Sequence, residues 1–201
     1  LQKFDEMMKY VDKLDSADLV EDEILNPAGW VMLGFICDPR TGLGYHQDFT
    51  TSNLQLMQNL VQYIRTMSID DILANSDVKE RVDMYLENDA RCREFIKENS
   101  RVDGPVVITD TRVNTDMPPG NRFLVYPLFP ETNISIRVLN VKGGEAVSIS
   151  VGHSITNRTS EVDVGSLLLG YGGGGHKKVG TCQVPAAEAD KVLGEIVDVL
   201  K

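Results

Sequence analysis

The sequence contains little cysteine and no long apolar segment. Its 201 residues include 3 cysteines, Cys37, Cys92 and Cys182, which are widely spaced and form no C-x-x-C pair. An odd number of dispersed cysteines excludes a disulfide framework and is typical of a reducing compartment, so we expect a cytoplasmic protein with small, buried thiols. No apolar run approaches the ~18–20 residues needed to cross a bilayer, so we expect no membrane partner.

The chain also lacks an excess of positive charge. It carries 20 Lys and Arg against 30 Asp and Glu, a formal net charge of −10. This balance argues against a long duplex nucleic acid as partner, because such a ligand needs a continuous basic track. A local basic pocket is still compatible with it: Arg158, Lys177 and Lys178 lie near one glycine-rich segment, although the two lysines are equally explained as solvated strand residues.

That glycine-rich segment is the run Gly172-Gly173-Gly174-Gly175-His176. Backbone N–H groups without neighbouring side chains can converge on an anion, and a histidine beside them can donate to a phosphate oxygen or carry a proton. Apolar residues at helical spacing precede the run, with Ser160 as the expected N-cap, and the alternating segment 179–184 follows it. We therefore expect a helix-to-strand connection that binds an anion. The alternative is a flexible surface turn with an incidental histidine.

A second polar segment follows the strand-like stretch 147–151. It reads Gly152-His153-Ser154-Ile155-Thr156-Asn157-Arg158-Thr159 and combines an imidazole, hydroxyls, an amide and a guanidinium. Arginine suits phosphate because its planar fork donates two parallel hydrogen bonds. The segment therefore favours a substrate contact, and the alternative is a solvated loop after a strand.

Together the two segments resemble the DHH-associated domain of the DHH-family phosphoesterases. In that family the glycine-rich loop and its histidine hold the phosphate end of the substrate. GHSITNR is similar to the exopolyphosphatase-like branch and departs from the Ser-x-Arg-Ser form of the oligonucleotide-degrading, oligoribonuclease-like branch. The resemblance implies that the substrate is bound by His153, Asn157, Arg158, Gly173, Gly174, Gly175 and His176.

The resemblance extends to residues 33–42, where an apolar run ends in Asp38. In the family this aspartate helps to bridge two divalent ions, so the resemblance implies that Asp38 is catalytic and ligates Mn²⁺ or Mg²⁺. It also places Asp15, part of an acidic helical stripe, near the metal site, and His46 is a further candidate ligand. The alternatives are a turn-forming Asp-Pro pair at Asp38 and a solvated acidic helix face at Asp15.

The chain contains no Asp-His-His triplet, although the resemblance covers nearly all of it. We therefore expect the C-terminal part of a longer enzyme whose remaining metal motifs lie upstream of Leu1. Residues 1–100 are then the end of a catalytic domain with a connector helix, and residues 101–201 are a substrate-binding, DHH-associated domain. The boundary is expected near residues 99–104, where the composition changes.

The expected fold class is α/β, with a mostly helical first part and a mixed-sheet α+β second part. Helices are expected at 1–16, 69–75, 77–98, 161–170 and 186–200. A further helix is expected after a cap within Thr51-Ser52-Asn53, and its apolar face is expected to comprise Leu54, Met57, Leu60, Val61 and Ile64. Strands are expected at 30–37, 106–109, 123–127, 134–139, 147–151 and 179–184.

The function that follows is that of a metal-dependent hydrolase. Two ions would generate a hydroxide that attacks phosphorus in a small phosphorylated substrate such as polyphosphate, a short oligonucleotide or a nucleotide, while this chain supplies the substrate-binding domain. One alternative is a non-catalytic phosphate- or nucleotide-binding module. Another is a tRNA-editing domain, against which the acidic charge and the segment 38–42 argue. The oligomeric state stays open, a homodimer included.

Overall fold

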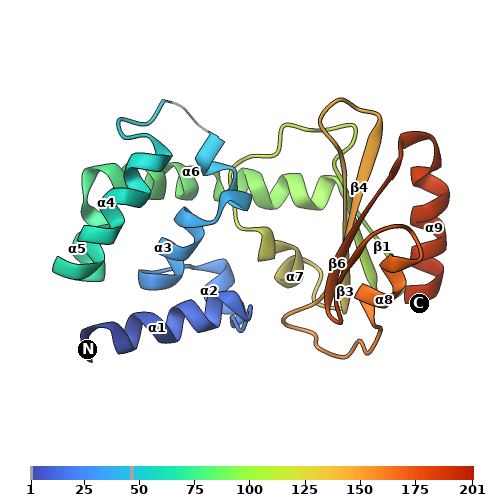
Figure 1. Cartoon of the computed structure of the whole chain (residues 1–201), viewed down its shortest axis with the longest axis horizontal. Helices are drawn as coiled ribbons and strands as arrows, with labels where there is room; N and C mark the ends of the chain where they lie inside the picture. Colours follow the sequence, from blue (N-terminus) through green and yellow to red (C-terminus); the bar gives the residue numbers. More distant parts are fainter. Residues whose placement is uncertain (1, 46–47) are drawn as a thin grey trace. The chain divides into compact units, whose positions relative to one another are not determined.

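The computed structural model describes residues 2–45 and 48–201, so the candidate ligand His46 lies outside the described residues. The chain divides into two compact units (Figure 1). One runs to Arg93 and takes in Pro118–Leu124, and the other contains Glu94–Met117 and Val125–Lys201. The assignment of these units to a catalytic and a substrate-binding domain stays a prediction.

The first unit is helical in the residues described. Its elements are α1 (Gln2–Asp15), α2 (Glu21–Leu25), α3 (Gly29–Cys37), α4 (Asn53–Thr66), α5 (Ile69–Ala74), most of α6 (Ser76–Glu98) and the short turns η1 (Pro39–Thr41), η2 (Leu43–Tyr45) and η3 (Arg122–Leu124). Local caps explain two of the starts: Ser52 accepts from Gln55 N at the start of α4, and Ser68 accepts from Asp71 N at the start of α5. These two helices lie where the sequence predicts them.

Two predicted strands are wrong. The apolar run 30–37 forms helix α3. This helix is buried on several sides, so its sequence shows no alternation of polar and apolar residues by which a helix could be told from a strand. Asp38 therefore follows a helix and not a strand. Residues 123–127 fall in η3 and in the short helix α7 (Val125–Leu128).

The buried face of α4 also differs from the prediction. Leu56 and Leu60 are buried, whereas Leu54 and Val61 are 71% and 58% exposed. The helix carries apolar residues on more than one side, so the spacing alone does not tell which side packs inward.

The second unit is built on one six-stranded mixed sheet. Its strands are β1 (Ser100–Asp103), β2 (Val106–Asp110), β3 (Ile134–Asn140), β4 (Ala146–His153), β5 (Gly174–His176) and β6 (Val179–Pro185), in the order β1-β2-β3-β4-β6-β5. Strands β2 and β3 are parallel, and the other neighbouring pairs are antiparallel. The α/β class with a mixed sheet is thereby confirmed.

Helices α8 (Val164–Leu169) and α9 (Ala189–Leu200), with the turn η4 (Ala186–Glu188) before α9, cover one face of this sheet (Figure 1). The N-cap of α8 is Asp163, which accepts from Ser166 N, and not Ser160 as predicted. The core between sheet and helices is aliphatic and includes Ile108, Ile136, Val138, Ile149, Val151, Cys182, Leu168, Leu193 and Ile196. In the described part of the chain, no helix is both long enough and apolar enough to cross a membrane.

Candidate functional site

Strand register brings the two polar segments of the second unit to the same end of the sheet. Gly152, near the end of β4, is paired with Val179 of β6. His176 of β5 is paired with the same Val179 across the opposite edge of β6. The backbone N–H of His153 donates to the carbonyl oxygen of Lys178 at 2.9 Å. The glycine run and the segment after β4 are therefore neighbours across β6.

This end of the sheet carries exposed basic groups. His176, Lys177 and Lys178 are consecutive, and all three are exposed. One carboxylate lies close to them: Asp163 accepts from Ser166 N at 3.0 Å. That hydrogen bond, aided by the charge of Lys177, lowers the pKa of Asp163. The local surface can attract an anion because Lys177 and Lys178 carry exposed positive charge there.

Two glycines of the run are required for close backbone packing. A Cβ at Gly173 would lie 2.4 Å from Thr181 O, and one at Gly175 would lie 2.2 Å from Val179 O. Residues Gly174–His176 form β5, an edge strand paired with β6. The run is therefore part of the sheet and not an open loop. The substrate-binding role of Gly173, Gly174 and Gly175 stays a prediction.

His153 is held by the protein itself. It is 9% exposed, and its Nε2 lies 2.9 Å from the carbonyl oxygen of Val162. This contact ties the end of β4 to the segment before α8. The geometry gives His153 a part in forming the site, and its predicted contact with substrate is not tested.

Asn157 and Arg158 lie in a loop that is organised by its own polar groups. Asn157 N donates to Ser154 Oγ at 3.0 Å, and Thr159 Oγ1 donates to Asn157 Oδ1 at 2.8 Å. Arg158 is exposed, and its Nε donates to the carbonyl oxygen of Ile155 at 2.9 Å. The loop presents the guanidinium at the surface, where a ligand oxygen can reach it.

In the first unit, Asp38 is engaged by two arginines. Its Oδ1 accepts from Arg40 N at 2.9 Å and from Arg40 Nε at 2.8 Å, and its Oδ2 lies 3.4 Å from Arg122 Nε. Partial burial raises the pKa of Asp38, but the hydrogen bonds from Arg40 and the charges of both arginines outweigh burial, so the pKa lies below its usual value. As described, Asp38 caps the turn η1.

The residues described do not by themselves fit a two-metal centre. Asp15 is the exposed last residue of α1, and both carboxylate oxygens of Asp38 face guanidinium groups. Over 2–45 and 48–201, no group of three or more His, Cys, Asp or Glu side chains is placed to hold a metal ion. The metal role of Asp38 and Asp15 stays a prediction.

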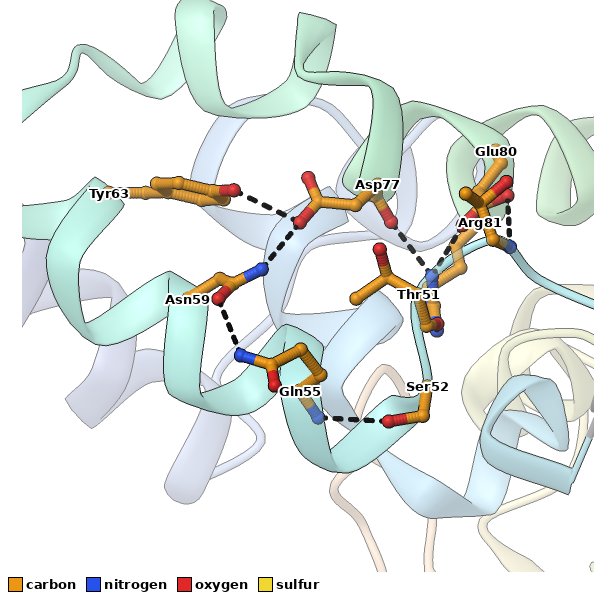
Figure 2. Close-up of polar contacts among 9 residues, drawn as sticks. Thr51, Ser52, Gln55, Asn59, Tyr63, Asp77, Glu80 and Arg81 are labelled. Atoms are coloured by element: carbon orange, nitrogen blue, oxygen red, sulfur yellow. Dashed lines mark hydrogen bonds and ion pairs between the residues drawn. The ribbon is translucent and has the colours of Figure 1, made fainter.

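A buried polar network joins α4, α6 and the segment before α4, and the sequence analysis did not predict it (Figure 2). Asp77 Oδ2 accepts from Asn59 Nδ2 and from Tyr63 Oη, each at 3.0 Å. Burial, together with the hydrogen bond to Asp77, raises the pKa of Tyr63. The network fixes α4 against α6 within the first unit.

Arg81 is the second centre of that network, and its side chain is 1% exposed. Its guanidinium donates to Asp77 O at 2.8 Å and to Thr51 O at 2.6 Å, and it lies 4.1 Å from the ring centroid of Phe49. Burial lowers the pKa of Arg81, and the carboxylate of Glu80 opposes this effect. Thr50 N donates to Glu80 at 3.0 Å, so two neighbouring residues of α6 hold segment 49–51.

Comparison with known proteins points to phosphoesterases. A pGpG-specific phosphodiesterase, PggH from Vibrio cholerae, matches at 39% sequence identity with a TM-score of 0.88 over 98% of this chain. The chain spans 66% of the length of that protein. This similarity supports the resemblance to DHH-like phosphoesterases and confirms the α/β fold class.

A more distant match is an exopolyphosphatase-related protein from Bacteroides fragilis. It aligns at 13% identity with a TM-score of 0.44, over 71% of this chain and 42% of that one. A similarity of this size adds no argument about function. No family model and no curated protein matches the chain.

Proposed function

We propose that this chain supplies the substrate-binding part of a DHH-family phosphoesterase that acts on small phosphorylated substrates. The observation that carries the proposal is the 39% identity to a pGpG-specific phosphodiesterase over 98% of the chain. It is supported by the exposed basic end of the sheet around His176, which offers donors to a phosphate group. Among such substrates, a short linear dinucleotide is favoured over polyphosphate because that relative is specific for pGpG.

The chemistry at this end of the sheet is binding and orientation. The exposed imidazole of His176 can donate to a phosphate oxygen, and Arg158 can add a forked pair of hydrogen bonds. The contact between His153 and Val162 holds the end of β4 in place across β6 from His176. A phosphate held here anchors and orients one end of the ligand.

A second candidate function is non-catalytic binding of a phosphorylated ligand. The observation in its favour is that no metal-holding group of side chains exists among residues 2–45 and 48–201. Both candidates share the same binding site. They differ in whether metal-assisted hydrolysis of the bound ligand takes place.

The proposal is tested by calorimetric titration of GMP and pGpG into the purified chain. Loss of one charge-assisted hydrogen bond costs about 1.5–3 kcal/mol of binding free energy. His176→Ala is therefore expected to lower the affinity for both ligands at least tenfold. Lys142→Ala is the matched control, since it removes a positive charge in the turn between β3 and β4, at the opposite end of β4. Equal affinity of wild type and His176→Ala for both ligands would overturn the proposed site.

A further inference from the structure

A row of polar side chains crosses the sheet on the face opposite α8 and α9. Thr109 of β2 is paired with Arg137 of β3, Arg137 with Ser150 of β4, Ser150 with Thr181 of β6, and Thr181 with Gly174 of β5. Paired residues on neighbouring strands point to the same side of a sheet. The row therefore leads from the middle of the sheet to the glycine run.

The alternation of burial confirms which face carries the row. The neighbours Ile136, Val138, Ile149 and Cys182 belong to the core under α8 and α9. Because side chains alternate along a strand, Arg137, Ser150 and Thr181 lie on the other face. His176 shares that face, since it is paired with Val179, two residues before Thr181.

The row is chemically suited to an anionic, hydroxyl-bearing ligand. Ser150 Oγ and Thr181 Oγ1 lie 2.9 Å apart, and each hydroxyl keeps further donor and acceptor capacity. Thr181 is exposed, while Ser150 and Arg137 are partly exposed. The guanidinium of Arg137 lies 3.8 Å from Met117 Sδ, and its planar fork suits the paired oxygens of a phosphate group.

The distance between this row and His176 sets the size of the ligand. Strands are about 4.8 Å apart and rise about 3.4 Å per residue, so Cα of His176 and Cα of Ser150 are about 12 Å apart, and Arg137 is about 16 Å from His176. Orthophosphate cannot touch both ends. A ligand with two phosphate groups joined through a nucleoside is long enough, once the arginine side chain extends toward it.

We propose that Arg137, with Ser150 and Thr181, forms a subsite for the second phosphate of a dinucleotide whose first phosphate lies at His176. This inference rests on the proposed function and extends it. With this subsite the sheet face distinguishes ligands by length. A mononucleotide occupies the end at His176 alone, and a dinucleotide also occupies the row.

The test compares two probes, pGpG with two phosphate groups and GMP with one, by titration calorimetry. Arg137→Gln is expected to lower the affinity for pGpG at least tenfold and to leave the affinity for GMP within twofold of wild type. Arg101→Gln is the matched control, because Arg101 is paired with Ile108, a core residue, and its loss changes the net charge by the same amount. Arg137→Lys, which keeps the charge without the fork, is expected to recover part of the pGpG affinity.

The outcomes separate the two proposals. Equal effects of Arg137→Gln on both probes, or no effect on either, overturn the subsite. If Arg137→Gln does not fold, the pair Ser150→Ala and Thr181→Val keeps the guanidinium and is judged by the same selectivity for pGpG. If wild type binds neither GMP nor pGpG, the proposed function fails and the subsite fails with it.

Discussion

Gly175 of β5 and Gly180 of β6 lie so close together that a Cβ on Gly175 would stand 2.4 Å from Gly180 Cα. Gly175→Ala must therefore push β5 away from β6. We expect a loss of about 1–3 kcal/mol in the free energy of unfolding, as for overpacking of a tight interior. Thermal unfolding followed by circular dichroism measures it.

Gly174→Ala is the control from within the same run. A Cβ there would meet only Leu169 Cδ2, at 3.9 Å, which is ordinary van der Waals contact. We expect its stability to stay within about 0.5 kcal/mol of wild type. If both variants melt at the wild-type temperature, β5 does not pack on β6 in the manner described.

The buried guanidinium of Arg81 predicts a large stability effect in the first unit. Arg81→Met leaves the carbonyl oxygens of Thr51 and Asp77 without this donor and removes the ion pair with the Glu80 carboxylate. We expect a loss of about 3–5 kcal/mol. Urea unfolding followed by the fluorescence of Trp30, the single tryptophan, reports this unit.

The control for Arg81 is Lys79→Met, on an exposed part of the same helix. Lys79 pairs with Asp83 four residues along α6, and both side chains are about half exposed. Such a pair contributes about 0.5 kcal/mol or less. Similar unfolding midpoints for Arg81→Met and Lys79→Met would show that the network is not buried as described.

The ion pair between Asp110 and Arg112 makes the free energy of unfolding of the second unit depend on pH. Its carboxylate accepts from Arg112 at 2.6–3.1 Å, and Arg112 also pairs with Asp190 at 2.7 Å. Burial raises the pKa of Asp110, but the bonds from Arg112 outweigh it and the folded pKa lies below the usual value. The stabilisation is therefore present above the unfolded pKa of about 3.9 and is lost as pH falls through the folded pKa.

Asp110→Asn is accordingly expected to lower the free energy of unfolding at pH 7 by about 1–2 kcal/mol. This is the contribution of a charge-assisted hydrogen bond, reduced because the pair is partly exposed to solvent. The difference from wild type should shrink as pH falls below about 4. Urea midpoints at several pH values measure it, with the exposed Asp116→Asn as control. A difference that is constant with pH would contradict the ion pair.

The sequence predicted the parts of the fold that local chemistry decides. The N-cap of α4 is Ser52, which lies within the predicted capping segment 51–53, and the alternation in 147–151 predicts β4. The run 30–37 was misassigned because its burial on several sides depends on neighbours that the local pattern does not contain. For the same reason no local pattern showed that Arg81 is buried, since its partner carbonyl at Thr51 lies thirty residues away.

The candidate site was predictable in composition but not in arrangement. His153 and His176 stand in similar polar contexts, yet one is buried against Val162 and the other is exposed on an edge strand. The sheet register decides this difference, because it places Gly152 and His176 on either side of Val179. The polar row through Arg137 likewise exists only through the pairing of strands far apart in sequence.

We expect this chain to bind a phosphorylated ligand at His176 and not to hydrolyse it unaided. Phosphorus NMR of pGpG with the purified chain and Mg²⁺ tests both parts in one measurement. We expect the pGpG resonances to shift or broaden on addition of wild type, to change much less with His176→Ala, and no GMP resonance to form. Unchanged pGpG resonances would contradict the binding site, and accumulation of GMP would show that the described residues contain a catalytic centre that their geometry does not reveal.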